Sequence, residues 1–487
     1  MKKRLFIALA LAIPTLTGCD MAKTVTVSTA KELLDVSGKD RKIVLESDID
    51  FDYQTLSAPI SIHSIEGNNH KIKNVVVHTV NNINTSLFTT KDEKGVHGKI
   101  SNLVLDDVTI TGDSTNAASF VSAFAFKEFE NIQINNCTLS ITGNKQSSCV
   151  VGSISGGSDP REINYKKKDE VTVKNCKVSN SKIIVQGPSS GNPALYVSGI
   201  AGDAESISKC LVDNLTIEVN GGYLYQDIRI GGISSHAQGN IDNCEVKNSN
   251  FSGTNTWHGS NILGTTNVSE IQIGGIYSNC SRGNGVFETT YNSNTISFCT
   301  AHDNILTAKT YGDVRSGGIS AFTYGVINNC VAYNNEIRRL KLDNTVDKHF
   351  MGGIVGNAVK GTITSTISYD NQIIDEINSG KSEEESAGGI FGAISSTIIK
   401  NSASGINTIQ QVFADEFGPS SSNISDCYIS NNQYLNSNNL PILNRDEFKD
   451  SSSMMVKLLL NAPQWDFSND MPTLQLGLWK SIWKHSY

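Results

Sequence analysis

Three acidic residues recur at one point of a repeated phrase and offer the clearest potential for chemistry in this chain. Asp227, Glu270 and Asp313 each lie two residues before a polar side chain, in the phrases DIRIGGI, EIQIGGI and DVRSGGI. The side chains that follow them are Arg229, Gln272 and Arg315, and Tyr196 and Phe350 extend the second row. Clustered carboxylates can hold calcium or act as an acid and base pair. Alternating acids and Arg on neighbouring strands also avoids stacking like charges. The two outward rows therefore indicate an exposed, charge-balanced sheet face, a carbohydrate-contacting patch or a catalytic cluster.

Cysteine is the second candidate, because seven of the ten cysteines share one position of the repeat. An Ile or Val lies three residues before each of them, and Leu103, Thr366 or Ser402 fills the position where Cys is missing. The pattern favours an inward stack of small, soft side chains; pairing of adjacent cysteines and a metal or nucleophilic role are the alternatives. Cys149 and Cys280 lie outside the pattern, no Cys-x-x-Cys occurs, and no metal site is predicted. The seven are Cys137, Cys176, Cys210, Cys244, Cys299, Cys330 and Cys427.

Asparagine marks a further position, four residues after the cysteine position. Asn and Asp tolerate left-handed backbone better than other residues with a side chain, so a bend is expected there. Stacked amides at such a bend can hydrogen-bond from coil to coil. The repeat that contains Cys137 does not fit this rule. The predicted ladder consists of Asn180, Asn214, Asn248, Asn334 and Asn431, with Asp107, Asp303 and Asp370 in the same position.

These residues need a scaffold that repeats with them. The triplet Gly-Gly-Ile begins at 231, 274, 317, 352 and 388, and a repeat period of about 30 to 46 residues is typical of stacked units. β-branched residues punctuated by Gly and Asn favour strands over helices. We expect an all-β solenoid of about ten coils with three short strands each, roughly 50 Å long at the spacing of parallel strands.

The pattern resembles the right-handed parallel β-helix with its asparagine ladder, and the opening strands resemble those of pectate-lyase-like proteins. The Gly-Gly-Ile and Ile-x-Asn-Cys phrases also resemble the GLUG repeat of bacterial surface and secreted proteins, from about residue 195 to 430 with weaker copies at 85 to 160. The resemblance implies a β-helix and an adhesin-like role. On the same fold, polysaccharide lyases and hydrolases use clustered carboxylates.

The N-terminus resembles that of a bacterial lipoprotein. A basic start and a short apolar run precede Leu-Thr-Gly-Cys, in which Cys19 would be acylated after cleavage. Several acyl chains provide stable membrane attachment. Asp20 resembles the signal for inner-membrane retention in enteric bacteria; elsewhere the outer membrane or cell surface is expected.

The predicted organisation has five parts. Residues 1–18 are a signal peptide, 19–27 the lipidated Cys and a tether, 28–84 a cap with a short helix and the first coils, 85–435 the repeats, and 436–487 a closing cap.

Composition limits the partners. The net charge is −8, only 18% of residues are charged, and no long basic block occurs, so a nucleic acid partner is not expected. The leading hypothesis is a membrane-anchored lipoprotein that binds a glycan or an envelope protein, or serves as a rigid scaffold, without catalytic residues or a cofactor. The alternative is a polysaccharide-active enzyme on the same fold.

Overall fold

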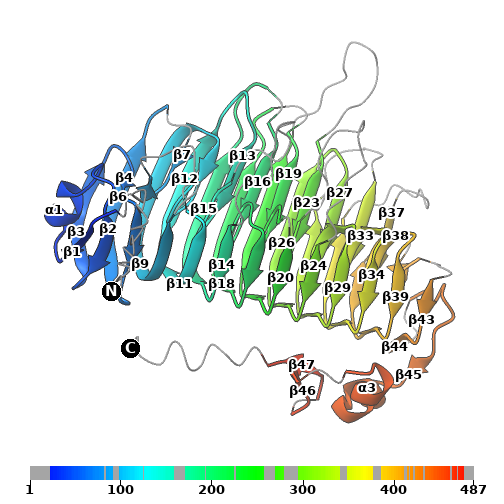
Figure 1. Cartoon of the computed structure of the whole chain (residues 1–487). Coiled ribbons are helices and arrows are strands. Elements are labelled where there is room, and N and C mark those ends of the chain that lie inside the picture. Colours follow the sequence, from blue (N-terminus) through cyan, green and yellow to red (C-terminus); the bar gives the residue numbers. More distant parts are fainter. Residues whose placement is uncertain are drawn as a thin grey trace, which may run out of the picture.

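Each repeat of the chain folds into one coil of a right-handed parallel β-helix, and the coils stack into a rod (Figure 1). This confirms the predicted fold class. The computed structural model describes residues 22–81, 84–90, 98–123, 126–157, 171–191, 193–223, 226–237, 239–256, 269–278, 294–340, 348–376, 385–410, 414–415, 417–419, 423–430, 434–460, 463–468 and 470–475. Among these residues, no helix has the length and apolar character that crossing a membrane requires. The strands of a coil occupy up to five positions, named rows 1 to 5 in chain order.

Row 1 precedes the cysteine position and forms a continuous parallel ladder from one end of the rod to the other. Its inward column is apolar from Val25 to Ile424. In the described residues the ladder has thirteen strands, which at about 4.8 Å per step span about 58 Å. This exceeds the expected ten coils, because strands before the repeats join the stack. Row 1 contains β1 (Thr24–Val27), β2 (Lys42–Leu45), β5 (Ser64–Glu66), the start of β9 (Lys99–Thr115), β11 (Glu128–Asn135), β14 (Thr172–Lys174), β17 (Ser206–Ser208), β20 (Asn240–Asp242), β24 (Thr295–Ser297), β29 (Val326–Asn328), β34 (Thr362–Thr364), β39 (Ile398–Lys400) and β43 (Ile424–Ser425).

Rows 2 and 3 follow the cysteine position, and several strands run through both. The long strands are β3 (Ile49–Leu56), β6 (Lys71–Thr79), β9, β15 (Lys177–Gln186) and β18 (Leu211–Asn220). Row 2 also contains the end of β11, β21 (Glu245–Lys247), β25 (Thr300–His302), β30 (Val331–Tyr333), β35 (Ile367–Tyr369), β40 (Ala403–Gly405), β44 (Tyr428–Ser430) and β45 (Ile442–Leu443). Row 3 contains β12 (Thr138–Gly143), β22 (Asn250–Asn255), β26 (Ile305–Thr310), β31 (Glu336–Arg339), β36 (Gln372–Asp375) and β41 (Thr408–Gln410).

Rows 4 and 5 lie on either side of the Gly-Gly-Ile turn. Row 4 is a separate parallel sheet of β7 (Asn84–Thr85), β10 (Ala117–Ala118), β13 (Cys149–Gly152), β16 (Leu195–Ser198), β19 (Ile228–Gly231), β23 (Ile271–Gly274), β27 (Val314–Gly317), β32 (His349–Gly352), β37 (Glu385–Gly388) and β42 (Ala414–Asp415). Row 5 has short strands joined by isolated bridges: β4 (Ile60–Ser61), β8 (Phe88–Thr89), β28 (Ser320–Thr323), β33 (Val355–Val359) and β38 (Phe391–Ser395).

The repeated Gly-Gly pair is explained by two different close approaches. A Cβ on Gly231 would lie 1.9 Å from the carbonyl oxygen of Ser234, so the first Gly permits a tight turn within one coil. A Cβ on Gly232 would lie 2.0 Å from the carbonyl oxygen of Gly275, so the second Gly permits contact with the next coil. Any larger residue at either position would push the backbone segments apart.

The N-terminal end carries the expected helix, α1 (Ala30–Asp35). Thr29 caps it by accepting from the backbone N–H of Glu32 at 3.2 Å, and Leu33 packs into the core. The carboxylate of Glu32 accepts from Ser28 N at 2.7 Å, one residue before the position of a capping box. Residues 24–27, expected as part of a tether, instead form β1, the first strand of row 1.

The C-terminal segment lies beside the rod, where a closing cap over the last coil was expected (Figure 1). It contains α2 (Arg445–Lys449), α3 (Ser451–Lys457), β46 (Trp465–Asp466) and β47 (Thr473–Leu474). Its apolar side chains pack on Val331, Ile367 and Ala403, whose side chains point outward from row 2. Trp465 Nε1 also donates to Asn329 Oδ1 at 2.9 Å. The segment covers the flank because the outward side chains there are apolar.

Candidate functional site

The predicted line of side chains that contains Arg229 and Arg315 lies on the outer side of row 4. Neighbouring strands place Tyr196, Arg229, Gln272, Arg315 and Phe350 side by side in successive coils. The three acidic residues immediately precede β19, β23 and β27. The structure thus brings together the six residues of the predicted ligand patch, which are Asp227, Arg229, Glu270, Gln272, Asp313 and Arg315.

Ion pairs within the patch involve all three of its carboxylates. Arg229 Nη2 lies 3.6 Å from Asp227 Oδ2. Arg315 pairs with Glu270 through Nη1, and its Nη2 lies 3.9 Å from Asp313 Oδ2. Each carboxylate therefore faces a guanidinium of the patch, and Glu270 and Asp313 share that of Arg315.

Two of the acids also hold the backbone of the next coil. Asp227 Oδ1 accepts from the backbone N–H of Glu270 at 3.1 Å, and Asp313 Oδ1 accepts from that of Lys348 at 3.0 Å. These bonds satisfy N–H groups at the start of the following strand, where the ladder has not yet begun. The acids consequently have a structural task besides any contact with a ligand.

The patch is more buried than an exposed sheet face, which corrects the expectation from sequence. Arg229 is 5% exposed and Gln272 only 1%. The guanidinium of Arg229 lies 5.3 Å from the ring centre of Tyr196, and that of Arg315 lies 5.0 Å from the ring centre of Phe322 in row 5.

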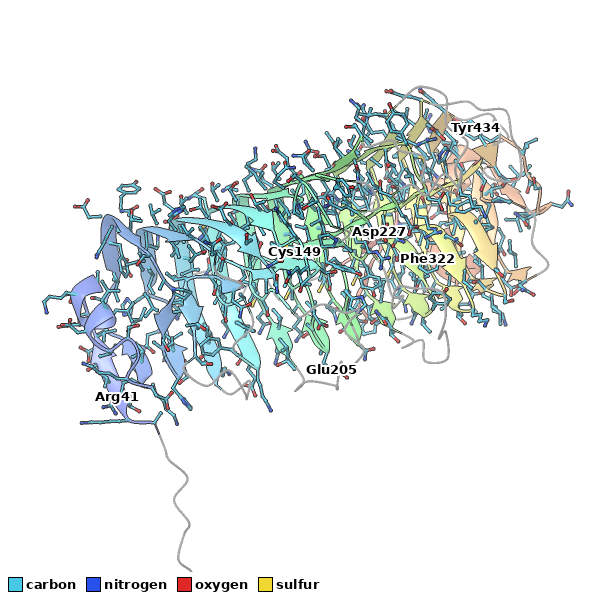
Figure 2. All side chains as sticks on the ribbon, turned by 90° about the horizontal axis from the view of Figure 1, so that it is seen from above. Arg41, Cys149, Glu205, Asp227, Phe322 and Tyr434 are labelled. Atoms are coloured by element: carbon cyan, nitrogen blue, oxygen red, sulfur yellow. The ribbon has the colours of Figure 1, made fainter. Side chains whose placement is uncertain are left out.

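Burial and the nearby Arg229 lower the pKa of Arg315 to about 10. The side-chain oxygen Oε1 of Gln272 has no hydrogen-bond partner among the described atoms. Figure 2 labels Asp227 and Phe322 along this part of the rod.

The cysteine column is shorter than predicted, because Cys137 does not belong to it. The pairing of β11 with β14 and β15 places Ile132 beside Cys176, whereas Cys137 lies beside Ser181 at the next corner. The corrected alignment removes the apparent exception, since Asn136 and Leu139 then stand four and seven residues after Ile132. Cys176, Cys210, Cys244, Cys299 and Cys330 occupy five successive coils, followed by Thr366, Ser402 and Cys427.

The thiols make a recurring hydrogen bond at this corner. Cys210 Sγ donates to the carbonyl oxygen of Ser208 at 3.3 Å, and Cys299 Sγ to that of Ser297 at 3.2 Å. Ser402 Oγ makes the equivalent bond to Lys400 O at 2.8 Å. The position therefore accepts a small donor side chain, which explains the exchange of Cys for Ser. All eight described cysteines are buried and free, and burial raises the pKa of Cys149 to about 12.

The predicted asparagine positions lie at a left-handed bend. Asn180, Asn214, Asn248 and Asn334 have φ between 48° and 57°; Asn431 and Cys280 lie outside the described residues. The amide of Asn214 donates to Asn180 Oδ1 at 2.8 Å on the outside of the rod.

A second, buried ladder lies one residue further along the chain and was missed from sequence. Asn304, Asn335, Asn371 and Asn407 point inward in successive coils. Each accepts through Oδ1 from the backbone N–H of the residue that occupies the same position in the preceding coil. Further upstream, Ser249 and Ser181 accept in the same way from Leu215 and Cys137. In three of these four coils the signal in the sequence is a pair of residues, Asp-Asn or Asn-Asn, in which the first bends the chain and the second enters the core; in the fourth, Ile406 has φ of 58° and precedes Asn407.

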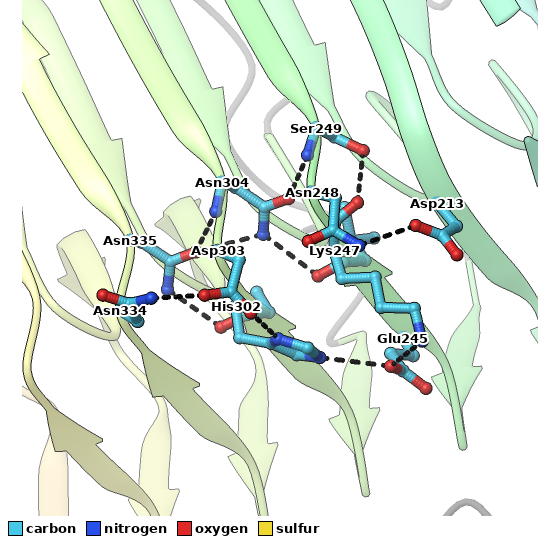
Figure 3. Close-up of polar contacts among 12 residues, drawn as sticks. Asp213, Glu245, Lys247, Asn248, Ser249, His302, Asp303, Asn304, Asn334 and Asn335 are labelled. Atoms are coloured by element: carbon cyan, nitrogen blue, oxygen red, sulfur yellow. Dashed lines mark hydrogen bonds and ion pairs between the residues drawn. The ribbon is translucent and has the colours of Figure 1, made fainter. Parts of the chain in front are cut away.

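A charged and aromatic cluster on the outer side of row 2 was also missed. Figure 3 shows His302 between two carboxylates, with Nε2 3.1 Å from Glu245 Oε1 and Nδ1 2.6 Å from Asp303 Oδ2. Its ring stacks on Tyr333 at 4.6 Å, and Tyr333 stacks on Tyr369 at 5.0 Å. Burial alone would lower the pKa of His302, but the two carboxylates outweigh it and raise that pKa. His302 is therefore stabilised as an imidazolium.

Three ionisable side chains meet inside the rod. Arg339 Nη1 lies 3.6 Å from Asp375 Oδ1 and contacts His349 Nδ1, and His349 Nδ1 lies 3.7 Å from Asp375 Oδ2. All three side chains are fully buried. Burial and Arg339 lower the pKa of His349 to about 2, so its imidazole is neutral. Such inward charges on a strand are costly unless they are paired.

Comparison with known proteins finds only distant structural similarity. No family model matches the chain, and no curated protein sequence matches it. Among solved structures, it is similar to an IgA1 protease (11% identity, TM-score 0.33, covering 68% of this chain and 23% of that one) and to a proposed immunoglobulin A1 protease from Bacteroides ovatus (13%, TM-score 0.30, 93% of each chain). It is also similar to the catalytic domain of a GH87 α-1,3-glucanase in complex with nigerose (11%, TM-score 0.23, 83% and 63%). The chain thus spans under a quarter of the first protein. Similarity at this level carries no argument about this chain.

Proposed function

We propose that this chain is an exported, membrane-anchored lipoprotein whose β-helix is a non-catalytic, adhesin-like scaffold that holds a glycan or an envelope protein. The observation that carries the proposal is the internal pairing of the patch. Asp227, Glu270 and Asp313 each face an Arg, and two of them also accept from the backbone of the next coil. A polysaccharide lyase or hydrolase needs carboxylates available to calcium, to substrate or to a proton in transfer.

The anchor is the second part of the proposal. Cys19 would carry the acyl chains, and the described fold begins only a few residues later, with β1 at Thr24. The rod would then start close to the membrane. The compartment follows from the bacterial lineage: the periplasmic face of the inner membrane if enteric sorting applies to Asp20, and otherwise the outer membrane or the cell surface.

The test combines binding and activity on the same protein. The mature chain, freed of its anchor by Cys19→Ser, is incubated with isolated cell envelopes and with a panel of acidic and neutral polysaccharides. We expect retention on envelopes and no release of reducing or unsaturated sugars, with or without calcium. Sugar release that the double variant Glu270→Gln/Asp313→Asn abolishes would overturn the proposal in favour of an enzyme. Absence of retention on every envelope fraction would contradict the binding role.

A further inference from the structure

The five-cysteine column is a continuous run of thiols inside the rod. It consists of Cys176, Cys210, Cys244, Cys299 and Cys330, each fully buried and unpaired by disulfide. Strand pairing on both sides of the corner places these five cysteines in register in successive coils. No coil interrupts the run, so sulfur follows sulfur through five coils.

The spacing of this column suits one kind of coordination. Neighbouring parallel strands lie about 4.8 Å apart, and two metal–sulfur bonds of about 2.3 Å placed end to end span about 4.6 Å. Because the side chains point into the rod, an ion between two stacked sulfurs lies along the rod axis. The Cβ–Sγ–metal angle is then close to a right angle, which suits a thiolate. Stacked sulfurs are thus arranged for a linear, two-coordinate ion.

We propose that the five-cysteine column binds soft monovalent cations of the copper group, copper(I) or silver(I), each held in line between the sulfurs of neighbouring coils. Thiolates select such ions over hard cations. Each ion replaces the thiol protons of its two cysteines, which pass to water. If the three inner sulfurs each bridge two ions, five protons leave and four ions enter, and the column keeps one negative charge. If no sulfur bridges, two ions bind.

Other metals fit the column poorly. Zinc prefers four ligands arranged as a tetrahedron, and within the described residues no group of three or more His, Cys, Asp or Glu side chains is placed to hold a metal ion. The surrounding side chains, such as Ile207 and Val246, are apolar. The column therefore offers sulfur ligands in an apolar core, where the other polar atoms near the sulfurs are backbone carbonyl oxygens such as Ser208 O and Ser297 O.

The chain supplies its own matched controls. Ser402 occupies the same position as the column cysteines and keeps the corner hydrogen bond, so Cys→Ser variants are expected to fold. Cys137 lies in a different column, and Cys427 has Ser402 as its neighbour. Replacing these two removes as much sulfur as replacing two members of the column and leaves the column intact.

The experiment uses silver(I), which needs no reductant. The full chain is incubated with silver(I), exchanged against excess free cysteine, and the retained ions are counted by native mass spectrometry; circular dichroism confirms folding of each variant. We expect two to four retained ions per chain, unchanged in Cys137→Ser/Cys427→Ser. In Cys210→Ser/Cys299→Ser the three remaining thiols no longer have neighbours, and retention should be lost. In Cys176→Ser/Cys330→Ser three adjacent thiols remain, and one or two ions should stay bound.

Either of two results would overturn the proposal. One is that free cysteine removes every ion from the wild-type chain. The other is that Cys210→Ser/Cys299→Ser retains as many ions as Cys137→Ser/Cys427→Ser, which would show adventitious binding to scattered thiols.

Discussion

Replacing Asn371 by Ala tests whether the buried amide ladder stabilises the rod. Asn371 Oδ1 accepts from the backbone N–H and from Nδ2 of Asn335, both at 3.0 Å. Its Nδ2 donates to Ala332 O at 3.0 Å. Asn371→Ala leaves these three groups without that partner inside the core, and an unsatisfied buried group costs about 1–3 kcal/mol. Since Asn335 Nδ2 keeps its bond to Ala301 O, we expect the free energy of unfolding to fall by about 3–5 kcal/mol.

The matched control is Asn334→Gly, one residue before the ladder. Asn334 has φ of 51°, which Gly adopts without strain, and its side chain bonds Asp303 on the exposed surface. The expected cost is about 1 kcal/mol or less. Urea denaturation followed by circular dichroism measures both, and hydrogen exchange at β30 and β35 locates the loss. Equal costs for the two variants would show that the inner ladder is not the stabilising element.

Four further outcomes follow from the same structure. Cys19→Ser should release the protein from membranes, and labelled palmitate that persists in the variant would refute acylation at Cys19. Alkylation under denaturing conditions without reductant should modify the members of the five-cysteine column; recovery of disulfide-linked peptides would contradict the free thiols. Glu270→Gln should destabilise by about 1–3 kcal/mol, because the largely buried Arg315 keeps only its longer contact with Asp313, and adding Arg315→Met should recover part of that loss; unchanged melting of Glu270→Gln would refute it. The raised pKa of His302 means that its contribution is complete below the unfolded value of 6.5 and is lost as pH rises through the folded value. In His302→Gln, melting temperature should lose that pH dependence; a retained dependence would assign it to another group.

Most of the fold could be predicted from the sequence repeat, because each coil needs the same backbone conformations and these select the same residue types at the same positions. Gly231 and Gly232 are needed by close approaches that every coil makes, and the left-handed bends select Asn and Asp. Cys137 was misplaced because two corners of the coil each tolerate a small side chain three residues after an apolar one. Only the strand pairing distinguishes the two corners, and it places Ile132, not Cys137, in the cysteine column.

The inward and outward faces were harder to predict than the strands. Arg339 and Asp375 occupy inward positions that are apolar in most coils, and His349 reaches them from row 4. The neighbouring residues in the sequence do not show whether such a charged side chain points inward or outward; only the register of the strands does. The exposure of the patch was misjudged for a similar reason, since Arg315 is covered by Phe322, a residue of the next row.

The docked C-terminal segment changes how the far end of the rod can open. In a stack of coils, stability is close to a sum of nearest-neighbour terms, and terminal coils fray one at a time. The bond from Trp465 to Asn329 joins residues 136 positions apart, and the same segment packs on Val331, Ile367 and Ala403 in three successive coils. Opening one of these coils therefore disturbs the packing of the others. Because the segment links these coils to one another, the last coils should unfold together as one cooperative unit and not one at a time.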